Sequence, residues 1–159
     1  MLDYHLSATV TDALWHGIHH RAELPCGAED YFAVTGATPT SPDSRRRFRR
    51  VRVRGRAAVR WGSELLGVYT IDVSPAGIGF FSPIQLFPKE RVTIMIEECD
   101  PKELVIRRCR RGGKACYACG GEFTGGSLGP GPYRELLHLL KAHDSGGASG
   151  SSGTASGRK

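Results

Sequence analysis

The stretch "SRRRFRRVRVRGRAAVRW", from Ser44 to Trp61, combines a dense run of arginines with an alternation of apolar and basic residues. From Val51 onward most odd positions are apolar and most even positions are arginine, which is the period of a strand with one buried face. We therefore expect a β-strand from Val51 to Trp61, with the even-numbered side chains pointing outward. The arginines expected to be surface charge on this strand are Arg52, Arg54 and Arg56.

Short apolar segments separated by turn residues follow this strand along the chain. Their close spacing favours an antiparallel barrel or sandwich over a fold of alternating strands and helices. The sequence thus predicts an all-β domain whose six strands form an antiparallel barrel. The five further strands are expected over residues 65–72, 78–82, 92–96, 104–110 and 115–123.

The end of the chain has a helical pattern. In "GPGPYRELLHLLKAHD" Pro132 is a suitable first helical residue, and Tyr133, Leu136 and Leu140 recur with the spacing of one helix face. We expect a C-terminal helix of about three turns that packs on the barrel. The Gly- and Ser-rich segment 144–159 is expected to be disordered because it has almost nothing to bury.

Residues 1–43 are expected to form an N-terminal extension. Val10, Leu14 and Ile18 recur at helical spacing, so a short helix is possible there despite Gly17. The turn-rich segment from Thr35 to Ser44 is expected to be a linker to the barrel.

The basic character of the chain is local. Formal net charge is +6, and nine arginines lie between residues 45 and 60, so the remainder is net acidic. This distribution indicates one anion-binding surface. No apolar run is long enough to span a bilayer and no signal-peptide pattern is present, so we expect a cytoplasmic protein whose five cysteines are reduced thiols.

Two short motifs place ligand-binding chemistry close together. Arg46 and Arg50 stand four residues apart just before the first strand, and 21 residues separate Arg50 from the segment "DVSPAG". That segment supplies the carboxylate of Asp72, the hydroxyl of Ser74, and Gly77, a residue able to adopt positive φ and to let a ligand approach the backbone.

The motifs RxxxR and DxSxxG at this spacing resemble the signature of the PilZ family of bacterial cyclic di-GMP receptors. The resemblance covers residues 44–143. It implies a small β-barrel that binds cyclic di-GMP through Arg46, Arg50, Asp72, Ser74 and Gly77 and relays the signal by changing shape or partner. It also implies a protein that is not an enzyme and that acts on a downstream partner which the sequence does not name.

The chemistry of these side chains suits a guanine dinucleotide. A guanidinium can bind guanine O6 and N7, pair with a phosphate or stack on a base, whereas an ionised carboxylate accepts from the guanine N1–H and N2–H groups. Arg45, next to the pair, could add a phosphate contact and favour two stacked ligands per chain. Alternatively, Arg45 is solvated at the end of the linker.

Two other functions are compatible with the sequence. A PilZ-type barrel could be a protein-interaction module without nucleotide, although the intact motifs argue against it. The arginine run could instead bind nucleic acid, but it has few interleaved aromatic residues and the rest of the chain is acidic.

We expect no metal, no cofactor and no catalytic residues. Cys116 and Cys119 point to opposite faces of a strand, and His16, His19 and His20 have no carboxylate at a metal-binding spacing. No nucleophile, base and orienting group stand in a recognisable arrangement.

Overall fold

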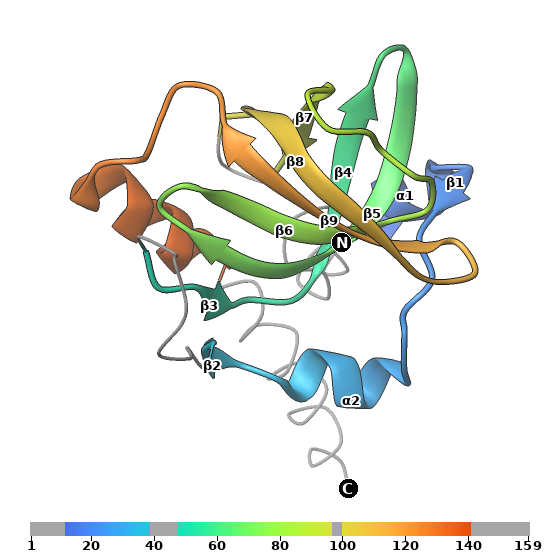
Figure 1. The fold of residues 1–159 in the computed structure, drawn as a ribbon. Helices are drawn as coiled ribbons and strands as arrows, with labels where there is room; N and C mark the ends of the chain where they lie inside the picture. Colours follow the sequence, from blue (N-terminus) through green and yellow to red (C-terminus); the bar gives the residue numbers. More distant parts are fainter. Residues whose placement is uncertain (1–11, 39–47, 97–99, 141–159) are drawn as a thin grey trace, which may run out of the picture.

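A computed structural model of the chain describes residues 12–38, 48–96 and 100–140 (Figure 1). Strands are the predominant secondary structure in these ranges. The elements are α1 (Asp12–Gly17), β1 (His20–Arg21), α2 (Ala28–Ala33), β2 (Gly36–Ala37), β3 (Val51–Arg52), β4 (Arg56–Trp61), β5 (Glu64–Ser74), β6 (Gly77–Ser82), β7 (Arg91–Met95), β8 (Lys102–Gly113), β9 (Cys116–Phe123) and a C-terminal helix over residues 130–140.

The six longer strands close into an antiparallel barrel. They follow the order β5, β4, β7, β8, β9 and β6, and β6 pairs with β5 to complete the circuit. The predicted six-stranded barrel is therefore confirmed. The two-residue strands β1, β2 and β3 extend the sheet beyond the barrel.

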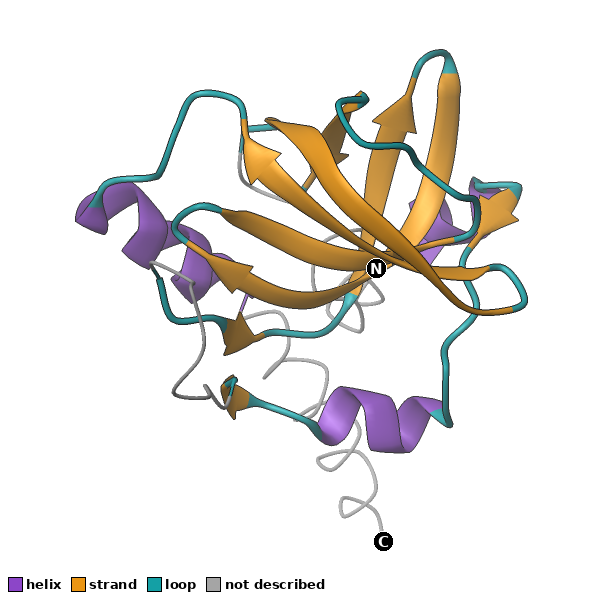
Figure 2. Cartoon of the chain, viewed as in Figure 1, coloured by secondary structure: helices purple, strands orange, loops and turns teal. Residues whose placement is uncertain are grey.

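The core fills the barrel and extends to the C-terminal helix. Phe80, Leu104 and Ile106 are fully buried strand residues, and Leu136 and Leu140 bring the helix into the same cluster. Each such side chain stabilises the fold by about 1.5–3 kcal/mol through burial. The predicted C-terminal helix is thus confirmed, and Figure 2 shows the helices outside the barrel at separate places. In the described part of the chain, no helix is long and apolar enough to cross a membrane.

The first predicted strand is interrupted, and the buried Thr70 accounts for the break. Its hydroxyl donates to the carbonyl of Val53 over 2.7 Å and accepts from the N–H of Gly55 over 2.9 Å. Backbone groups of residues 53–55 thus form hydrogen bonds with a side chain at the point where a regular strand would pair with its neighbour. The prediction of one continuous strand from Val51 to Trp61 was wrong at this point, and β3 is left as a separate two-residue strand.

The N-terminal extension packs on the outer face of the barrel. Trp15 and Ile18 are buried against Ala58, whereas Leu14 is 39% exposed. The expected helix is present as α1. The prediction of its buried face was wrong, because Leu14 is exposed and Trp15 is buried. Val10 lies outside the described residues. The ring centroids of Trp15 and Tyr69 lie 5.0 Å apart, so aromatic contacts attach α1 to β5.

The region expected to be a linker is partly structured. Gly36 and Ala37 form β2, which pairs with β3, and the Thr38 N–H donates to the Arg50 carbonyl over 2.8 Å. The extension is therefore joined to the strand that follows the arginine run. The rest of the expected linker, and the tail expected to be disordered, lie outside the described residues.

The outward arginines of the first strand are half-buried, so their assignment as exposed surface charge was wrong. The extension covers them: the Arg54 guanidinium lies 4.3 Å from the centroid of the Tyr31 ring, and that of Arg56 lies 5.2 Å from Trp15. Arg52 donates to the carbonyl of Ala37 over 3.1 Å. Strand alternation predicted the direction of these side chains but could not reveal the covering segment.

Candidate functional site

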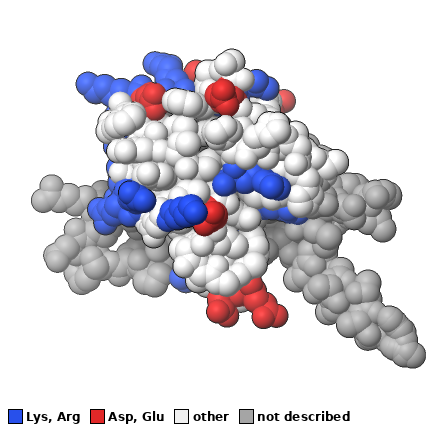
Figure 3. Space-filling view, turned by 90° about the vertical axis from the view of Figure 1, so that its right-hand side faces the viewer, with Lys and Arg blue, Asp and Glu red and all other residues white. Residues whose placement is uncertain are grey.

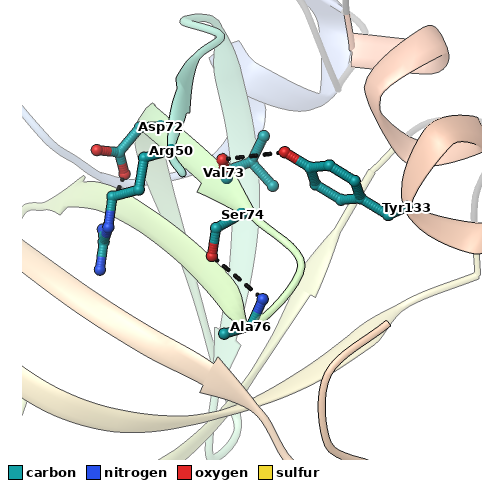
Figure 4. Close-up of polar contacts among 6 residues, drawn as sticks. All are labelled: Arg50, Asp72, Val73, Ser74, Ala76 and Tyr133. Carbon is teal, nitrogen blue, oxygen red and sulfur yellow. Dashed lines mark hydrogen bonds and ion pairs between the residues drawn. The ribbon is translucent and has the colours of Figure 1, made fainter. Parts of the chain in front are cut away.

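Arg50 and Asp72 form an ion pair at the edge of the barrel. Val51 of β3 pairs with Val73 of β5, and this register places the preceding arginine beside Asp72. Nη1 of Arg50 donates to Oδ1 of Asp72 over 3.2 Å, with side-chain exposures of 26% and 13% (Figure 4). The partial burial shields the pair from solvent, so its electrostatic interaction is stronger than that of an open surface pair.

Asp72 lies within β5 and not in a turn. Its partner across the ladder is Gly79 of β6, and a Cβ atom at Gly79 would stand 2.7 Å from Asp72 Oδ1. The absence of a side chain at this position leaves room for the carboxylate. Asp72 is therefore not placed to cap the turn between β5 and β6.

Ser74 stabilises the tight turn between β5 and β6. Its hydroxyl accepts a hydrogen bond from the Ala76 N–H over 3.1 Å, and Ser74 is 6% exposed (Figure 4). From the other side, the Tyr133 hydroxyl of the C-terminal helix donates to the Val73 carbonyl over 3.5 Å. A serine hydroxyl can donate as well as accept, so capping the turn leaves its hydrogen able to bind an anion.

Gly77 is required for a different reason from the one expected. Among the described glycines, positive φ occurs only at Gly36, Gly62 and Gly126. At Gly77 a Cβ atom would collide with the carbonyl oxygen of Gly121 and lie 2.9 Å from the Glu122 Cα. The glycine therefore permits close approach of β6 and β9, and the expectation of positive φ was wrong.

A hollow of about 100 Å³ lies beside these residues. Arg50, Ser74 and Gly77 line one side of it. The opposite side comes from β8 and β9, which sequence reasoning did not connect with the site; its residues are Arg107, Arg108, Gly120, Gly121 and Glu122. Two features of the sequence could have indicated this side of the hollow. They are the second arginine run, "RRCRR", and the glycine pair Gly120 and Gly121, which lies opposite in the β8–β9 hairpin.

The family model described as PilZ domain matches residues 44–138, which is more than half of the chain. The chain belongs to the PilZ family. PilZ domains are generally cyclic di-GMP receptors or adaptors rather than enzymes. No curated protein matches the chain.

The structure brings together four of the six residues expected to bind ligand in this PilZ domain: Arg50, Asp72, Ser74 and Gly77. The other two, Arg45 and Arg46, lie outside the described residues, so their roles stay predictions. The matched region begins at residue 44 and leaves out the extension that packs on the PilZ barrel.

The four described cysteines are free thiols: Cys26 of the N-terminal extension, and Cys109, Cys116 and Cys119 of the PilZ barrel. Cys119 belongs to the main core and Cys116 does not, as their opposite directions in the strand predicted. The cross-strand neighbour of Cys119 is Cys109, and their Sγ atoms lie 3.1 Å apart. Within the described ranges, no group of three or more His, Cys, Asp or Glu residues could hold a metal ion.

Proposed function

We propose that this PilZ domain binds cyclic di-GMP at the hollow beside the β5–β6 turn. The observation that supports the proposal is the 3.2 Å pairing of Arg50 with Asp72, a donor and an acceptor of the kinds that can bind guanine. Ser74 and Gly77 stand at the same end of β5 and β6 and line the hollow with Arg50. Arg46 would join them, as the family motif implies.

The roles follow from the chemistry of each group. The Asp72 carboxylate accepts from the N1–H and N2–H donors of guanine. The Arg50 guanidinium, which pairs with Asp72 in the structure, would turn to a phosphate or to guanine O6 and N7. The ligand thus replaces one ion pair with several charge-assisted contacts.

Isothermal titration with cyclic di-GMP tests the proposal. We expect saturable binding, and a loss of more than about 1.5 kcal/mol in Arg50→Ala, the scale of a charge-assisted contact. Asp72→Asn should lose nearly as much as Asp72→Ala, because an amide presents a donor where guanine needs an acceptor.

Arg60, exposed on β4, is the matched arginine control, and Arg60→Ala should bind normally. Absence of binding to the unaltered protein, or normal binding by Arg50→Ala, would overturn the proposal.

The arrangement of charges on one face of the described structure bears on the alternative of nucleic-acid binding. On the face that carries α1, β1 and the β8–β9 turn, the described basic side chains lie in separate groups with carboxylates between them (Figure 3). A nucleic-acid surface requires a more continuous basic track. Nucleic-acid binding would also weaken steeply with salt whatever the base sequence, so titrations at two salt concentrations separate the two functions.

A route for the signal follows from the small size of β3. Its pairing with β5 is a single residue pair, Val51 with Val73, so a shift of the preceding arginines would cost few backbone hydrogen bonds. β3 also pairs with β2, which belongs to the N-terminal extension. Ligand-induced movement at Arg50 would therefore be transmitted to the extension, where a downstream partner could detect it.

A further inference from the structure

The ladder of the barrel aligns Asp72 with an arginine three strands away. Asp72 of β5 is opposite Gly79 of β6, Gly79 is opposite Gly120 of β9, and Gly120 is opposite Arg108 of β8. Residues directly opposite one another in antiparallel strands point to the same face of the sheet. The four residues therefore form one row across the outer face, with a carboxylate at one end and a guanidinium at the other.

The middle of the row is a flat shelf of backbone. Gly79 and Gly120 carry no side chains, and neighbouring strands are about 4.8 Å apart, so the shelf is about two strand spacings wide. A Cβ atom at Gly120 would lie 3.7 Å from Cγ and Nε of Arg108, which shows that the arginine lies over this glycine. The shelf is therefore bounded by Arg108 on one side and by Asp72 on the other.

Arg108 is better placed for a ligand than its neighbour Arg107. The Nε of Arg107 donates to Glu122 over 3.0 Å, whereas Arg108 has no carboxylate partner within the described residues. The register shifts between Ile106 and Arg108, so Arg107 is the extra residue of the irregularity, and both arginines are exposed. Such irregularities redirect side chains at the edges of binding sites.

We propose that Arg108 reads the O6 and N7 edge of a guanine that lies flat across Gly79 and Gly120. The inference rests on the proposed cyclic di-GMP function and adds a specificity residue outside the two sequence motifs. Asp72 accepts from N1–H and N2–H of the same base, at its other edge, so the two ends of the row read complementary groups. The glycine peptide planes can accept a planar base because Gly79 and Gly120 carry no side chains of their own. Only the Asp72 and Arg108 side chains, which would bind the edges of the base, have to turn aside.

Titration of four variants with cyclic di-GMP tests the inference. Arg108→Ala should weaken binding at least tenfold, and Arg108→Lys should recover little, because lysine lacks the planar fork that matches O6 and N7. Gly120→Val should also weaken binding at least tenfold by filling the shelf. Arg110→Ala is the matched control: Arg110 is exposed on the same strand opposite Ala118, one row further on, and its loss should leave affinity unchanged. Thermal unfolding of each variant confirms that it is folded, and Gly120→Ala replaces Gly120→Val if the latter is not.

The outcomes separate the two proposals. If the unaltered protein does not bind cyclic di-GMP, the proposed function fails and this inference fails with it. If Arg50→Ala loses binding while Arg108→Ala keeps it, only the present inference is overturned. Full recovery in Arg108→Lys would assign the residue to a phosphate and would contradict the reading of guanine.

Discussion

Arg50 and Asp72 connect the end of the arginine run to β5 through a contact of 3.2 Å between Nη1 and Oδ1. The only ladder pair that joins β3 to β5 is adjacent, between Val51 and Val73. The ion pair therefore fixes β3 to the barrel at a place where backbone pairing is minimal. It also holds the two side chains next to each other in the absence of ligand.

We predict a measurable coupling between these two side chains in the absence of ligand. A double-mutant cycle of Arg50→Ala and Asp72→Ala, followed by denaturant unfolding, should give a coupling free energy of about 1 kcal/mol. Both side chains are partly exposed, so a much larger value is not expected. A coupling of zero would show that the pair does not persist in solution.

The barrel could be predicted from sequence because its strands alternate with period two and are separated by turns. The candidate site could be predicted only in part. Arg50, Asp72, Ser74 and Gly77 belong to local motifs of fixed spacing, and the ladder brings them together. The spacing of the motifs does not indicate which residues of β8 and β9 line the hollow.

The missed features all depend on contacts between segments distant in sequence. Arg108 reaches the site through the closing ladder of β8 with β9 and of β9 with β6. Tyr31 and Trp15 cover the arginines of the first strand from the N-terminal extension. The break at residues 53–55 depends on the side chain of Thr70, which alternation of apolar residues cannot reveal.

Gly77 should not tolerate even a methyl group. Its Cβ would meet the backbone of Gly121 and Glu122, which cannot move without opening the pairing of β6 with β9. We expect Gly77→Ala to destabilise the protein by about 1–3 kcal/mol, as overpacking against backbone does. Thermal or denaturant unfolding measures the effect.

Gly113→Ala is the control for this substitution. Gly113 is also a strand glycine, but its Cβ would lie 3.9 Å from the Cβ of Cys116, an ordinary contact. Its replacement should leave stability nearly unchanged. Equal stability of the two variants would show that β6 and β9 are further apart than the structure has them.

The cysteines should differ sharply in their reaction with a maleimide. Cys26 is exposed, whereas Cys116 and Cys119 are buried, and burial raises the pKa of both buried thiols. Since the thiolate is the reactive form, we expect rapid labelling at Cys26 and labelling of the other two only after unfolding. Mass spectrometry of peptides reads each position separately. Fast labelling of Cys119 in the folded protein would contradict its place in the core.

The stability of the protein should depend on pH through Tyr31. This residue is 1% exposed and its hydroxyl donates to the Thr70 carbonyl over 2.6 Å. Burial raises the pKa of Tyr31 far above its ordinary value of 10.0, although the Arg54 guanidinium opposes the shift. In the folded protein Tyr31 therefore remains a neutral phenol. The stability that this provides is fully present below pH 10 and is lost as the pH rises above it, because the unfolded chain can then ionise.

Tyr31→Phe isolates this contribution. Near pH 7 the variant should be less stable by about 1 kcal/mol because the hydrogen bond is lost. At one pH unit above the pKa that Tyr31 has in the unfolded chain, its ionisation there lowers the free energy of unfolding of the unaltered protein by about 1.4 kcal/mol. Near pH 11 the difference in stability between the two proteins should therefore vanish or reverse. Tyr69 and Tyr133, whose pKa values are also raised by burial, are present in both proteins and cancel. Denaturant unfolding of both proteins at pH 8 and about pH 11 measures the change. A difference that stays constant over this range would show that the Tyr31 hydroxyl is open to solvent and does not bond to the Thr70 carbonyl.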